Sequence, residues 1–548
     1  MTCNSCADHV TRALRGVPGV IAVEVPGWQS ARAELVASAD VSDEALIQAV
    51  EAAGYRGTSA DRRPLTTTRE VLESSPSPVG GRDYDLVVIG TGGAGMAAAI
   101  RAAELGHRVC IVEAGTIGGT CVNIGCVPSK ALIRAAAAYH TAGHHPFAGG
   151  HTRAEGLDWP AVIGRKDKLV GELRQSKYVD VLASYGDRVT LTQGRARLRA
   201  DGGVALDNGQ VCWPGKVVIA TGARPRVLPL RGIEDVEVLD STSAMALETQ
   251  PHSLIVIGGR AVALELGQTF ARFGTRVTIL QRSPRIIPEH EPEIGEALAD
   301  VLREEGLIIH TGVTLLAIRQ DDGEKVVTAQ VNGQRREFRA EQVLMAAGRT
   351  PNTKDMGLKE AGIELDEGGF IVVDDSMQTS HPHVYAAGDV TNRPKLVYVA
   401  AAAGGIAAEN ALDGNSRRLD LTVLPDVIFT DPQVATVGLT EAQATARGYD
   451  VKVSTLPLAY VPRALAARNP RGLIELVADQ STDRLLGAHV LAPEAGEVIQ
   501  TAAMALKFGA TVADLVGTLF PYLTLVEGLK LAAQTFEKDV AKLSCCAG

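Results

Sequence analysis

The 548-residue chain is short of aromatic residues, of basic charge and of long apolar segments. Only 4% of its residues are aromatic, whereas 57 are glycine, a composition that suggests close backbone packing and nucleotide-binding loops. The formal net charge of −10 provides no basic field for phosphate groups, which disfavours nucleic acids and anionic membranes as partners. No apolar run reaches the roughly 18 residues that span a bilayer, so we expect no membrane insertion.

The stretch MTCNSCADHV lacks the charged and apolar regions of a signal peptide, which predicts a cytoplasmic protein. Disulfides in that compartment are redox-active or absent, so the eight cysteines need another explanation. Cys110 and Cys212 are expected to be small core or turn residues. The other six form three close pairs, which are Cys3 with Cys6, Cys121 with Cys126, and Cys545 with Cys546.

Two stretches of the chain repeat one pattern of strand, glycine turn, helix, glycine and strand. They are YDLVVIGTGGAGMAAAIRAAELGHRVCIVEAG and SLIVIGGRAVALELGQTFARFGTRVTILQRS, and the separation between Gly90 and Gly258 equals that between Gly106 and Gly274. This repetition predicts two dinucleotide-binding βαβ units. Beyond about residue 420, shorter strand-like segments and the helix EVIQTAAMALKF predict a third, α+β unit.

The first glycine turn has the complete G-x-G-x-x-G spacing. Gly90 allows the tight turn, Gly92 the approach of backbone to a pyrophosphate, and Gly95 the packing of helix on strand. Glu113, at the end of the second strand, can accept a hydrogen bond from a ribose hydroxyl. A purely structural turn is the alternative, and the strand, helix and acidic residue in order favour nucleotide binding. The expected contacts are Gly90, Gly92, Gly93, Ala94, Gly95 and Glu113.

The second glycine turn departs from this spacing, because Arg260 and Ala263 stand at its third and sixth positions. Its second strand ends at Gln281 rather than at an acidic residue, and Arg282 and Arg285 follow. Arginines without an acid favour a 2′-phosphate, which predicts NADPH over NADH; a solvated basic strand end is the alternative. The expected nucleotide contacts are Gly258, Gly259, Gln281, Arg282 and Gly348.

The string GGTCVNIGCVPSK places Cys121 and Cys126 five positions apart at the entrance to a helix. Such a pair can form a disulfide whose thiolate the helix N-terminus stabilises. Together with the upstream glycine turn, the string resembles the pyridine nucleotide-disulfide oxidoreductases, among them glutathione reductase and dihydrolipoamide dehydrogenase. The resemblance extends over residues 83–548 and includes the strings ATGARP, AAGRTPNT and VYAAGD.

This resemblance implies an FAD enzyme in which electrons pass from NADPH through FAD to the disulfide. Cys126 would be the thiolate nearest the flavin, and Cys121 would exchange with substrate. Lys130 and Glu265 match an ion pair near the flavin N5, although surface charge is the alternative for either residue alone. Asp389 matches the residue that contacts the ribityl chain. The other implied flavin contacts are Gly119, Thr120, Thr221 and Gly222.

Family members that reduce disulfides carry a His-Pro-Thr-x-x-Glu string near the C-terminus, whose histidine protonates the leaving thiolate. Here the matching string FPYLTLVEG keeps Thr524 and Glu527 but has Tyr522 in the histidine position. A tyrosine, with an ordinary pKa near 10, is a poor proton shuttle at neutral pH, so a dithiol or disulfide substrate is disfavoured. A buried core tyrosine is the alternative.

The terminal string LSCCAG contains two adjacent cysteines. Neighbouring Cα atoms lie about 3.8 Å apart, below the range of about 4.4 to 6.8 Å found in disulfides, so a bridge there is strained. We therefore expect Cys545 and Cys546 to be thiols that hold a soft metal ion and pass it on. A structural zinc ion needs four ligands, which no local sequence supplies.

The N-terminal string MTCNSCADHV resembles the metal-binding loop of heavy-metal-associated domains, in which Cys3 and Cys6 bind a thiophilic ion. A CxxC pair also occurs in thioredoxin-type redox sites and in zinc sites. The following helix and the absence of a second CxxC favour the metal carrier. Such domains usually have a strand before this loop, whereas this chain begins inside the motif. Either the start is misassigned or the small domain is compromised, so we do not assume that it folds independently.

Three thiol pairs, a flavin core and the missing histidine together resemble the mercuric reductases, a branch of this family that reduces Hg(II) to Hg(0). Hg(II) prefers linear coordination by two thiolates, so the resemblance implies ligand exchange from the tail pair to Cys121 and Cys126. It also implies a homodimer, in which each tail serves the partner's site, and Hg(II)–thiol complexes as substrates. The implied metal ligands are Cys3, Cys6, Cys121, Cys126, Cys545 and Cys546.

Tyr178 and Tyr522 match active-site tyrosines of that branch; for Tyr178, packing within an amphipathic helix is the alternative.

Two other functions compete with mercury detoxification: a thioredoxin-reductase-like enzyme whose tail relays electrons, and a metal carrier without turnover. Tyr522 disfavours the thioredoxin-reductase-like enzyme. The metal carrier without turnover is disfavoured by the intact residues Cys121, Cys126, Lys130 and Asp389. Histidines 140, 144 and 145 are expected to be a solvated helix end and turn.

The expected fold is α/β, with two Rossmann-like domains, an α+β C-terminal dimerisation domain and a small N-terminal domain of the ferredoxin-like βαββαβ type. The expected segments are a heavy-metal-associated domain at 1–59, a flexible linker at 60–82, an FAD-binding domain at 83–230, an NAD(P)H-binding domain at 231–350, a second FAD-binding or central segment at 351–420, and a dimerisation domain at 421–548.

Overall fold

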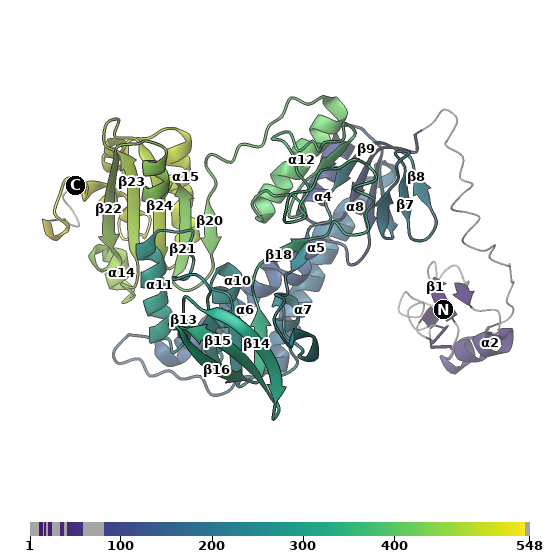
Figure 1. Cartoon of the computed structure of the whole chain (residues 1–548), viewed down its shortest axis with the longest axis horizontal. Helices are drawn as coiled ribbons and strands as arrows, with labels where there is room; N and C mark the ends of the chain where they lie inside the picture. The colour runs from purple at the N-terminus through teal and green to yellow at the C-terminus, as the bar shows by residue number, and fades with distance from the viewer. Residues whose placement is uncertain are drawn as a thin grey trace. The chain divides into compact units, whose positions relative to one another are not determined.

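A computed structural model describes residues 10–11, 13–14, 16–17, 20–24, 33–37, 41–57 and 82–542 of the chain (Figure 1). The chain divides into two compact units, residues 1–75 and 76–548, each of which is described by itself. The predicted metal ligands Cys3, Cys6, Cys545 and Cys546 lie outside the described residues. Within the described part, no helix has the length and apolar character required to cross a membrane.

The first unit contains an antiparallel strand pair, β1 (Val20–Glu24) and β2 (Glu34–Ala37), followed by helix α2 (Asp43–Ala52). Ser42 caps α2 by accepting a hydrogen bond from the Ala45 backbone N–H at 3.2 Å. Its small core consists of Val10, Leu14, Val23, Val41 and Leu46.

The second unit begins with a five-stranded parallel sheet in the order β19-β9-β3-β4-β5. Helices α4 (Gly93–Glu104) and α12 (Val397–Asp413) pack against each other beside this sheet (Figure 1). A side chain at Gly404 would collide with the Ala94 carbonyl, so glycine permits this close helix pair. The strands are β3 (Tyr84–Ile89), β4 (Val109–Glu113), β5 (Val189–Gln193), β9 (Pro214–Ile219) and β19 (Val384–Ala386).

The second predicted βαβ unit forms a four-stranded parallel sheet in the order β13-β12-β11-β17. Helices α10 (Ala261–Arg272) and α11 (Pro292–Glu304) belong to this part of the chain. Its strands are β11 (Ser253–Ile257), β12 (Arg276–Leu280), β13 (Ile308–His310) and β17 (Gln342–Met345). Two antiparallel meanders accompany the sheets, namely β6 (Ala196–Leu198), β7 (Val204–Leu206) and β8 (Val211–Cys212), and β14 (Thr314–Asp321), β15 (Glu324–Val331) and β16 (Gln334–Ala340).

The C-terminal part is an antiparallel sheet in the order β20-β21-β24-β23-β22, which confirms the expected α+β unit. Helix α15 (Ala495–Lys507) packs on β21 and β24. The strands are β20 (Asp426–Ile428), β21 (Gln433–Gly438), β22 (Val451–Pro457), β23 (Leu473–Asp479) and β24 (Leu485–Ala492). The smaller helices are α13 (Glu441–Ala446), α14 (Pro462–Ala466), α16 (Val512–Gly517) and α17 (Glu527–Gln534).

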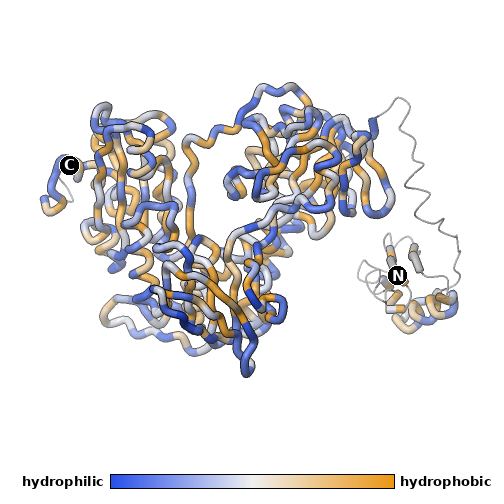
Figure 2. Tube along the Cα trace, in the orientation of Figure 1, coloured by the Kyte–Doolittle hydropathy of each residue, from blue (hydrophilic) through white to orange (hydrophobic). Residues whose placement is uncertain are grey.

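Hydrophobic stretches run through the sheet-forming parts of the chain, and hydrophilic residues mark many of the connecting loops (Figure 2). Between the strands β4 and β5 the chain forms a helical segment that contains both predicted redox cysteines. The helices are α5 (Gly119–Ile124), α6 (Cys126–His144), α7 (Trp159–Arg174) and α8 (Asp180–Ser184), with a π-helical stretch at Gln175–Val179.

Candidate active site

Cys121 lies within α5, and Cys126 is the first residue of α6. The two residues are free thiols that share a hydrogen bond, with Cys126 exposed and Cys121 half-buried. That bond from Cys121, assisted by the positive charge of Lys130, lowers the pKa of Cys126 to about 7. The pKa of Cys121 is raised, chiefly because its thiol donates this bond and because it is partly buried. Cys126 is therefore the preferred thiolate near neutral pH.

Glycines bring the cysteine helix against the first glycine turn. Gly119 has a φ of 62°, and a Cβ placed on it would lie 2.5 Å from the Gly92 Cα. Gly92 caps α4 without a side chain, so the backbone N–H groups at the start of that helix face the turn. The N-terminus of α4, which suits a dinucleotide pyrophosphate, thus lies against Gly119 at the start of the cysteine-bearing helix α5.

Glu113 ends β4 at the position predicted for ribose recognition. Its carboxylate accepts hydrogen bonds from the Thr91 N–H at 3.1 Å, from the Thr91 hydroxyl, and from the Gly115 N–H at 2.7 Å. The Thr91 hydroxyl in turn accepts a bond from the Gly118 N–H at 3.0 Å. Sequence reasoning did not foresee this chain of bonds, which holds the glycine turn against the loop before α5.

Lys130 and Glu265, which are 135 positions apart, form an ion pair of 2.7 Å between Nζ and Oε2. Lys130 stands one turn after Cys126 on α6, and Glu265 lies on α10 with only 6% of its side chain exposed. The pairing was expected from the family resemblance alone. A buried carboxylate that faces a half-exposed ammonium fixes the position of both charges more firmly than a surface pair would.

Tyr178 lies in the π-helical stretch between α7 and α8. Burial, with smaller contributions from the charges of Cys121 and Cys126, raises the pKa of Tyr178. A Cβ on Gly118 would lie 3.4 Å from the Tyr178 ring. The extra residue in a π-helix turn redirects a side chain, and such turns are frequent at functional sites. Tyr522 is 57% exposed in the segment before α17, and its predicted role remains untested.

The strings ATGARP and AAGRTPNT meet as the antiparallel strands β10 (Ala223–Pro225) and β18 (Arg349–Pro351). The Thr221 hydroxyl donates to the Asn352 carbonyl at 2.8 Å. Arg349 Nε lies 3.4 Å from an Asp389 carboxylate oxygen, and burial raises the pKa of Asp389. That Nε is buried and forms no hydrogen bond with the described protein atoms, so a polar group of a ligand would satisfy it.

These residues fit an FAD molecule. The glycine turn offers its N–H groups, Arg349 has an unsatisfied donor, and a Cβ on Gly222 would meet nothing within 4 Å, which leaves room beside the Asp389 loop. The residues that would hold FAD are Gly90, Gly92, Gly93, Ala94, Gly95, Glu113, Gly119, Thr120, Lys130, Thr221, Gly222 and Asp389.

The second glycine turn opens into a cavity of about 580 Å³. Gly258, with a φ of 128°, brings the turn so near the Ala346 carbonyl that a side chain would collide with it. Arg285 does not line the cavity, because its guanidinium donates to the Pro288 carbonyl at 3.0 Å and the His290 carbonyl at 3.2 Å. The lining includes the predicted residues Gly258, Gly259, Gln281, Arg282 and Gly348.

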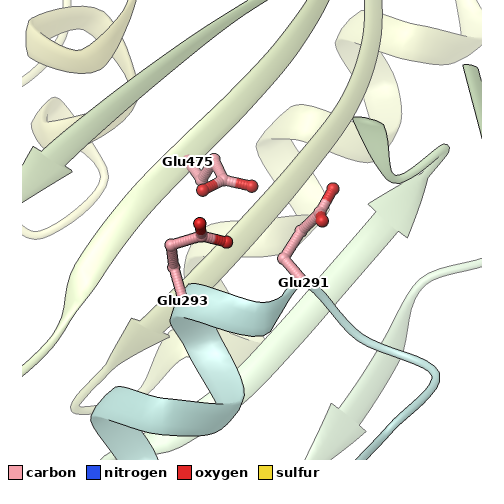
Figure 3. A group of neighbouring side chains, drawn as sticks. All are labelled: Glu291, Glu293 and Glu475. Atoms are coloured by element: carbon pink, nitrogen blue, oxygen red, sulfur yellow. The ribbon is translucent and has the colours of Figure 1, made fainter. Parts of the chain in front are cut away.

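Three carboxylates outside the cysteine site point toward one another (Figure 3). Glu291 and Glu293 lie at the start of α11 and Glu475 lies on β23, with carboxylate oxygens within 4.8 Å of each other. Burial, followed by the charges of the other two, raises the pKa of Glu475 to about 7. Sequence reasoning missed this group because its members come from distant segments. Among the described residues no histidine joins such a three-ligand group, and His140 and His144 instead stack at 4.1 Å.

Cys110 and Cys212 are buried in the core that contains the first parallel sheet, which confirms their expected role. Within the described residues, the cysteine site consists of Cys121 and Cys126 with Lys130, Glu265 and Tyr178 around them.

Fold and site together define an FAD-dependent oxidoreductase with a redox dithiol. Residues 84–404 match the pyridine nucleotide-disulphide oxidoreductase family model, residues 424–533 its dimerisation domain, and residues 1–56 the heavy-metal-associated domain. The mercuric reductase of Bacillus cereus is 43% identical over all of this chain and 86% of its own, and that of Shigella flexneri 46% over all of this chain and 99% of its own. The mercuric reductase of Streptomyces lividans is 48% identical over 85% of this chain and 98% of its own.

Solved structures agree with the fold. The HOCl-induced flavoprotein disulfide reductase RclA from Escherichia coli matches with a TM-score of 0.74 and 29% identity, covering 82% of this chain and 99% of its own. LpdA from Mycobacterium tuberculosis matches with a TM-score of 0.74 and 26% identity, covering 83% of this chain and 100% of its own. The chain therefore belongs to the pyridine nucleotide-disulfide oxidoreductases, in the mercuric reductase branch of that family.

Proposed function

We propose that the protein uses NADPH to reduce Hg(II) to volatile Hg(0) in mercury detoxification. The observation that carries this proposal is the Cys121–Cys126 pair, in which one thiol is poised as a thiolate near pH 7 beside Tyr178. Two thiolates match the linear coordination preferred by Hg(II), and reduction of the ion needs two electrons and no proton from a protein acid.

The cavity at the second glycine turn supports NADPH as the electron donor. Arg282, Arg260 and Arg226 line it, and Gln281 occupies the place where a carboxylate would repel a 2′-phosphate. Arg260 also contacts Glu289 at 3.3 Å, so it is partly neutralised. We assign the main phosphate contact to Arg282.

FAD, when bound, would supply two-electron transfer from a nicotinamide, one electron pair to reduce the Cys121–Cys126 disulfide and a further pair to reduce the Hg(II) ion that the two sulfurs hold. The protein residues supply position and charge. Lys130, held by Glu265, lowers the pKa of Cys126, and the Cys121 thiol donates the hydrogen bond that keeps Cys126 ionised. Once the pair is reduced, both sulfurs are available to exchange with the thiols that accompany Hg(II) into the site.

The delivery route is part of the same proposal. Cys545 and Cys546 receive Hg(II) from small thiol complexes and pass it to Cys121 and Cys126, and Cys3 and Cys6 collect the ion at the N-terminal domain. The dimerisation domain supports a homodimer, in which we assign each tail to the partner's site. The need for NADPH and for reduced thiols suits the cytoplasm.

One assay tests the proposal. NADPH oxidation is followed with Hg(II) under excess small thiol, and separately with a protein disulfide such as thioredoxin, while released mercury vapour is collected. We expect turnover and vapour with Hg(II) alone. Turnover on the disulfide only would identify a thioredoxin-reductase-like enzyme, and turnover on neither would identify a metal carrier.

A further inference from the structure

The third position of the second glycine turn carries Arg260, where the dinucleotide-binding pattern has a glycine that lets a pyrophosphate approach the backbone. Arg260 directly precedes α10, and its φ of −113° and ψ of −174° are ordinary extended backbone, so the arginine causes no strain there. Its side chain is exposed and lines the cavity of the turn. A positive side chain therefore stands beside the helix N-terminus at which such units bind a pyrophosphate.

The partner of Arg260 is Glu289, which lies in the loop between β12 and α11. Arg260 Nε is 3.3 Å from Glu289 Oε2, and both side chains are exposed. Within the part of the chain that the structure describes, Glu289 is the only acidic residue at ion-pair distance from Arg260. An exposed pair of this kind contributes little to stability, so it can open at little cost to the fold.

The loop that carries Glu289 is fastened to the glycine turn. The Ile287 N–H donates to the Gly259 carbonyl at 2.8 Å. The Arg285 guanidinium donates to the two backbone carbonyls on either side of Glu289, at 3.0 and 3.2 Å. Arg285 thus orders the loop rather than the cavity wall, and the backbone at Glu289 is held beside the start of α10.

We propose that Arg260 binds the pyrophosphate of the nicotinamide nucleotide, and that Glu289 is a positioning residue that holds Arg260 at the cavity in the free enzyme and competes with the pyrophosphate for it. The inference rests on the proposed function, in which this cavity takes NADPH. Because the nucleotide takes Arg260 from Glu289, the ion pair lowers nucleotide affinity and favours release. Arg282, which follows β12, keeps the main contact with the 2′-phosphate.

Binding of NADP⁺ and of NAD⁺ to the oxidised holoenzyme, measured by isothermal titration calorimetry, tests the inference without turnover. Arg260→Ala should raise the Kd of both nucleotides by about tenfold, because both contain the pyrophosphate. Arg282→Ala should raise the Kd of NADP⁺ far more than that of NAD⁺, because only NADP⁺ has the 2′-phosphate. Glu289→Gln should lower the Kd of both nucleotides by about two- to fivefold, since the pyrophosphate then meets no competitor for Arg260.

The double variant Arg260→Ala with Glu289→Gln separates an effect through Arg260 from direct repulsion between Glu289 and the phosphates. Its Kd should equal that of Arg260→Ala alone, and a gain from Glu289→Gln that persists without Arg260 would overturn the positioning role. The matched controls are Arg303→Ala and Asp300→Asn, which remove the same charges from an exposed pair on α11 with a separation of 2.9 Å. Neither control should change either Kd.

Unchanged affinity in a folded, flavin-containing Arg260→Ala enzyme would overturn the inference and leave the proposed function intact. A loss confined to NADP⁺ would make Arg260 a 2′-phosphate residue and would overturn the inference as well. If the wild-type enzyme bound neither nucleotide, the cavity would not serve NADPH, and the proposed function would fall together with the inference.

Discussion

Arg272 and Glu305 form a buried ion pair that joins α10 to the end of α11, with Arg272 Nη2 and Glu305 Oε1 2.7 Å apart and each side chain 5% exposed. A second bond links Arg272 Nε to Glu305 Oε2 at 2.9 Å, and Arg471 contacts the same carboxylate at 3.2 Å. The guanidinium and the carboxylate thus form two parallel hydrogen bonds, and this bidentate geometry fixes the orientation of both side chains in addition to pairing their charges.

Replacing Arg272 with methionine should strongly destabilise the domain that contains α10 and α11. The substitution leaves the Glu305 carboxylate buried without its main partner, a change that costs about 3 to 5 kcal/mol. Thermal unfolding of the holoenzyme, followed by circular dichroism, measures it. The double variant Arg272→Met with Glu305→Met should recover part of the loss. Arg303→Ala, which breaks an exposed pair with Asp300, is the control and should change little.

The glycine before Thr120 should be essential for holding FAD. In Gly119→Ala, a left-handed φ of 62° costs about 1 to 2 kcal/mol and the new Cβ meets the Gly92 Cα, so the loop must move away from the pyrophosphate turn. We expect FAD affinity to fall at least about tenfold. The ratio of flavin to protein absorbance after dialysis reports it.

Gly171→Ala provides the control for that experiment. Gly171 lies inside α7, and a Cβ there would meet nothing within 4 Å. Alanine should therefore raise helix stability by roughly 1 kcal/mol and leave the flavin content unchanged. Full flavin retention in Gly119→Ala would show that the close approach of the two loops does not support the cofactor.

The tail cysteines should control delivery rather than electron transfer. With Cys545 and Cys546 both replaced by alanine, turnover on thiol-bound Hg(II) should fall sharply, because no vicinal thiols remain to exchange ligands with Cys121 and Cys126. Reduction of that inner pair by NADPH, followed as new thiols per flavin, should be unaffected. Replacing Cys3 and Cys6 should matter little in dilute assay, and a collapse there would place the N-terminal domain on the catalytic path.

Repeated local patterns made much of the fold predictable. The glycine turns at Gly90 and Gly258 lie between strand and helix as expected, since the spacing itself encodes the turn. The site was predictable where one string holds both partners, as for Cys121 and Cys126. Two features could not be predicted from the sequence: the hydrogen bond from the Phe429 N–H to Glu265 on α10, and the group of three carboxylates in Figure 3. Both depend on how distant segments of the chain pack together. The π-helical turn at Tyr178 has no sequence signal that we could identify.

The three neighbouring carboxylates of Figure 3 should make the free energy of unfolding depend on pH. Glu475 has a pKa of about 7 in the folded protein against an ordinary value of 4.5, because it is buried and faces Glu291 and Glu293, with Glu441 nearby. Below pH 4.5 the carboxyl is protonated in both folded and unfolded chains. Between pH 4.5 and 7 only the folded chain keeps the proton, so the stability from this group falls as the pH rises, and above pH 7 the penalty is constant.

Glu475→Gln removes that penalty while keeping the hydrogen-bonding shape. Its unfolding midpoint should match the wild type near pH 4.5 and exceed it at pH 8, by a free energy on the order of 3 kcal/mol. Differential scanning fluorimetry across this range measures the difference. Glu248→Gln, at an exposed position, controls for the loss of one negative charge and should give no pH-dependent gain. If the unfolding midpoint of Glu475→Gln ran parallel to that of the wild type across this pH range, the pKa of Glu475 would not be raised in the folded protein. The penalty arises only if the folded protein holds a proton that the unfolded chain releases.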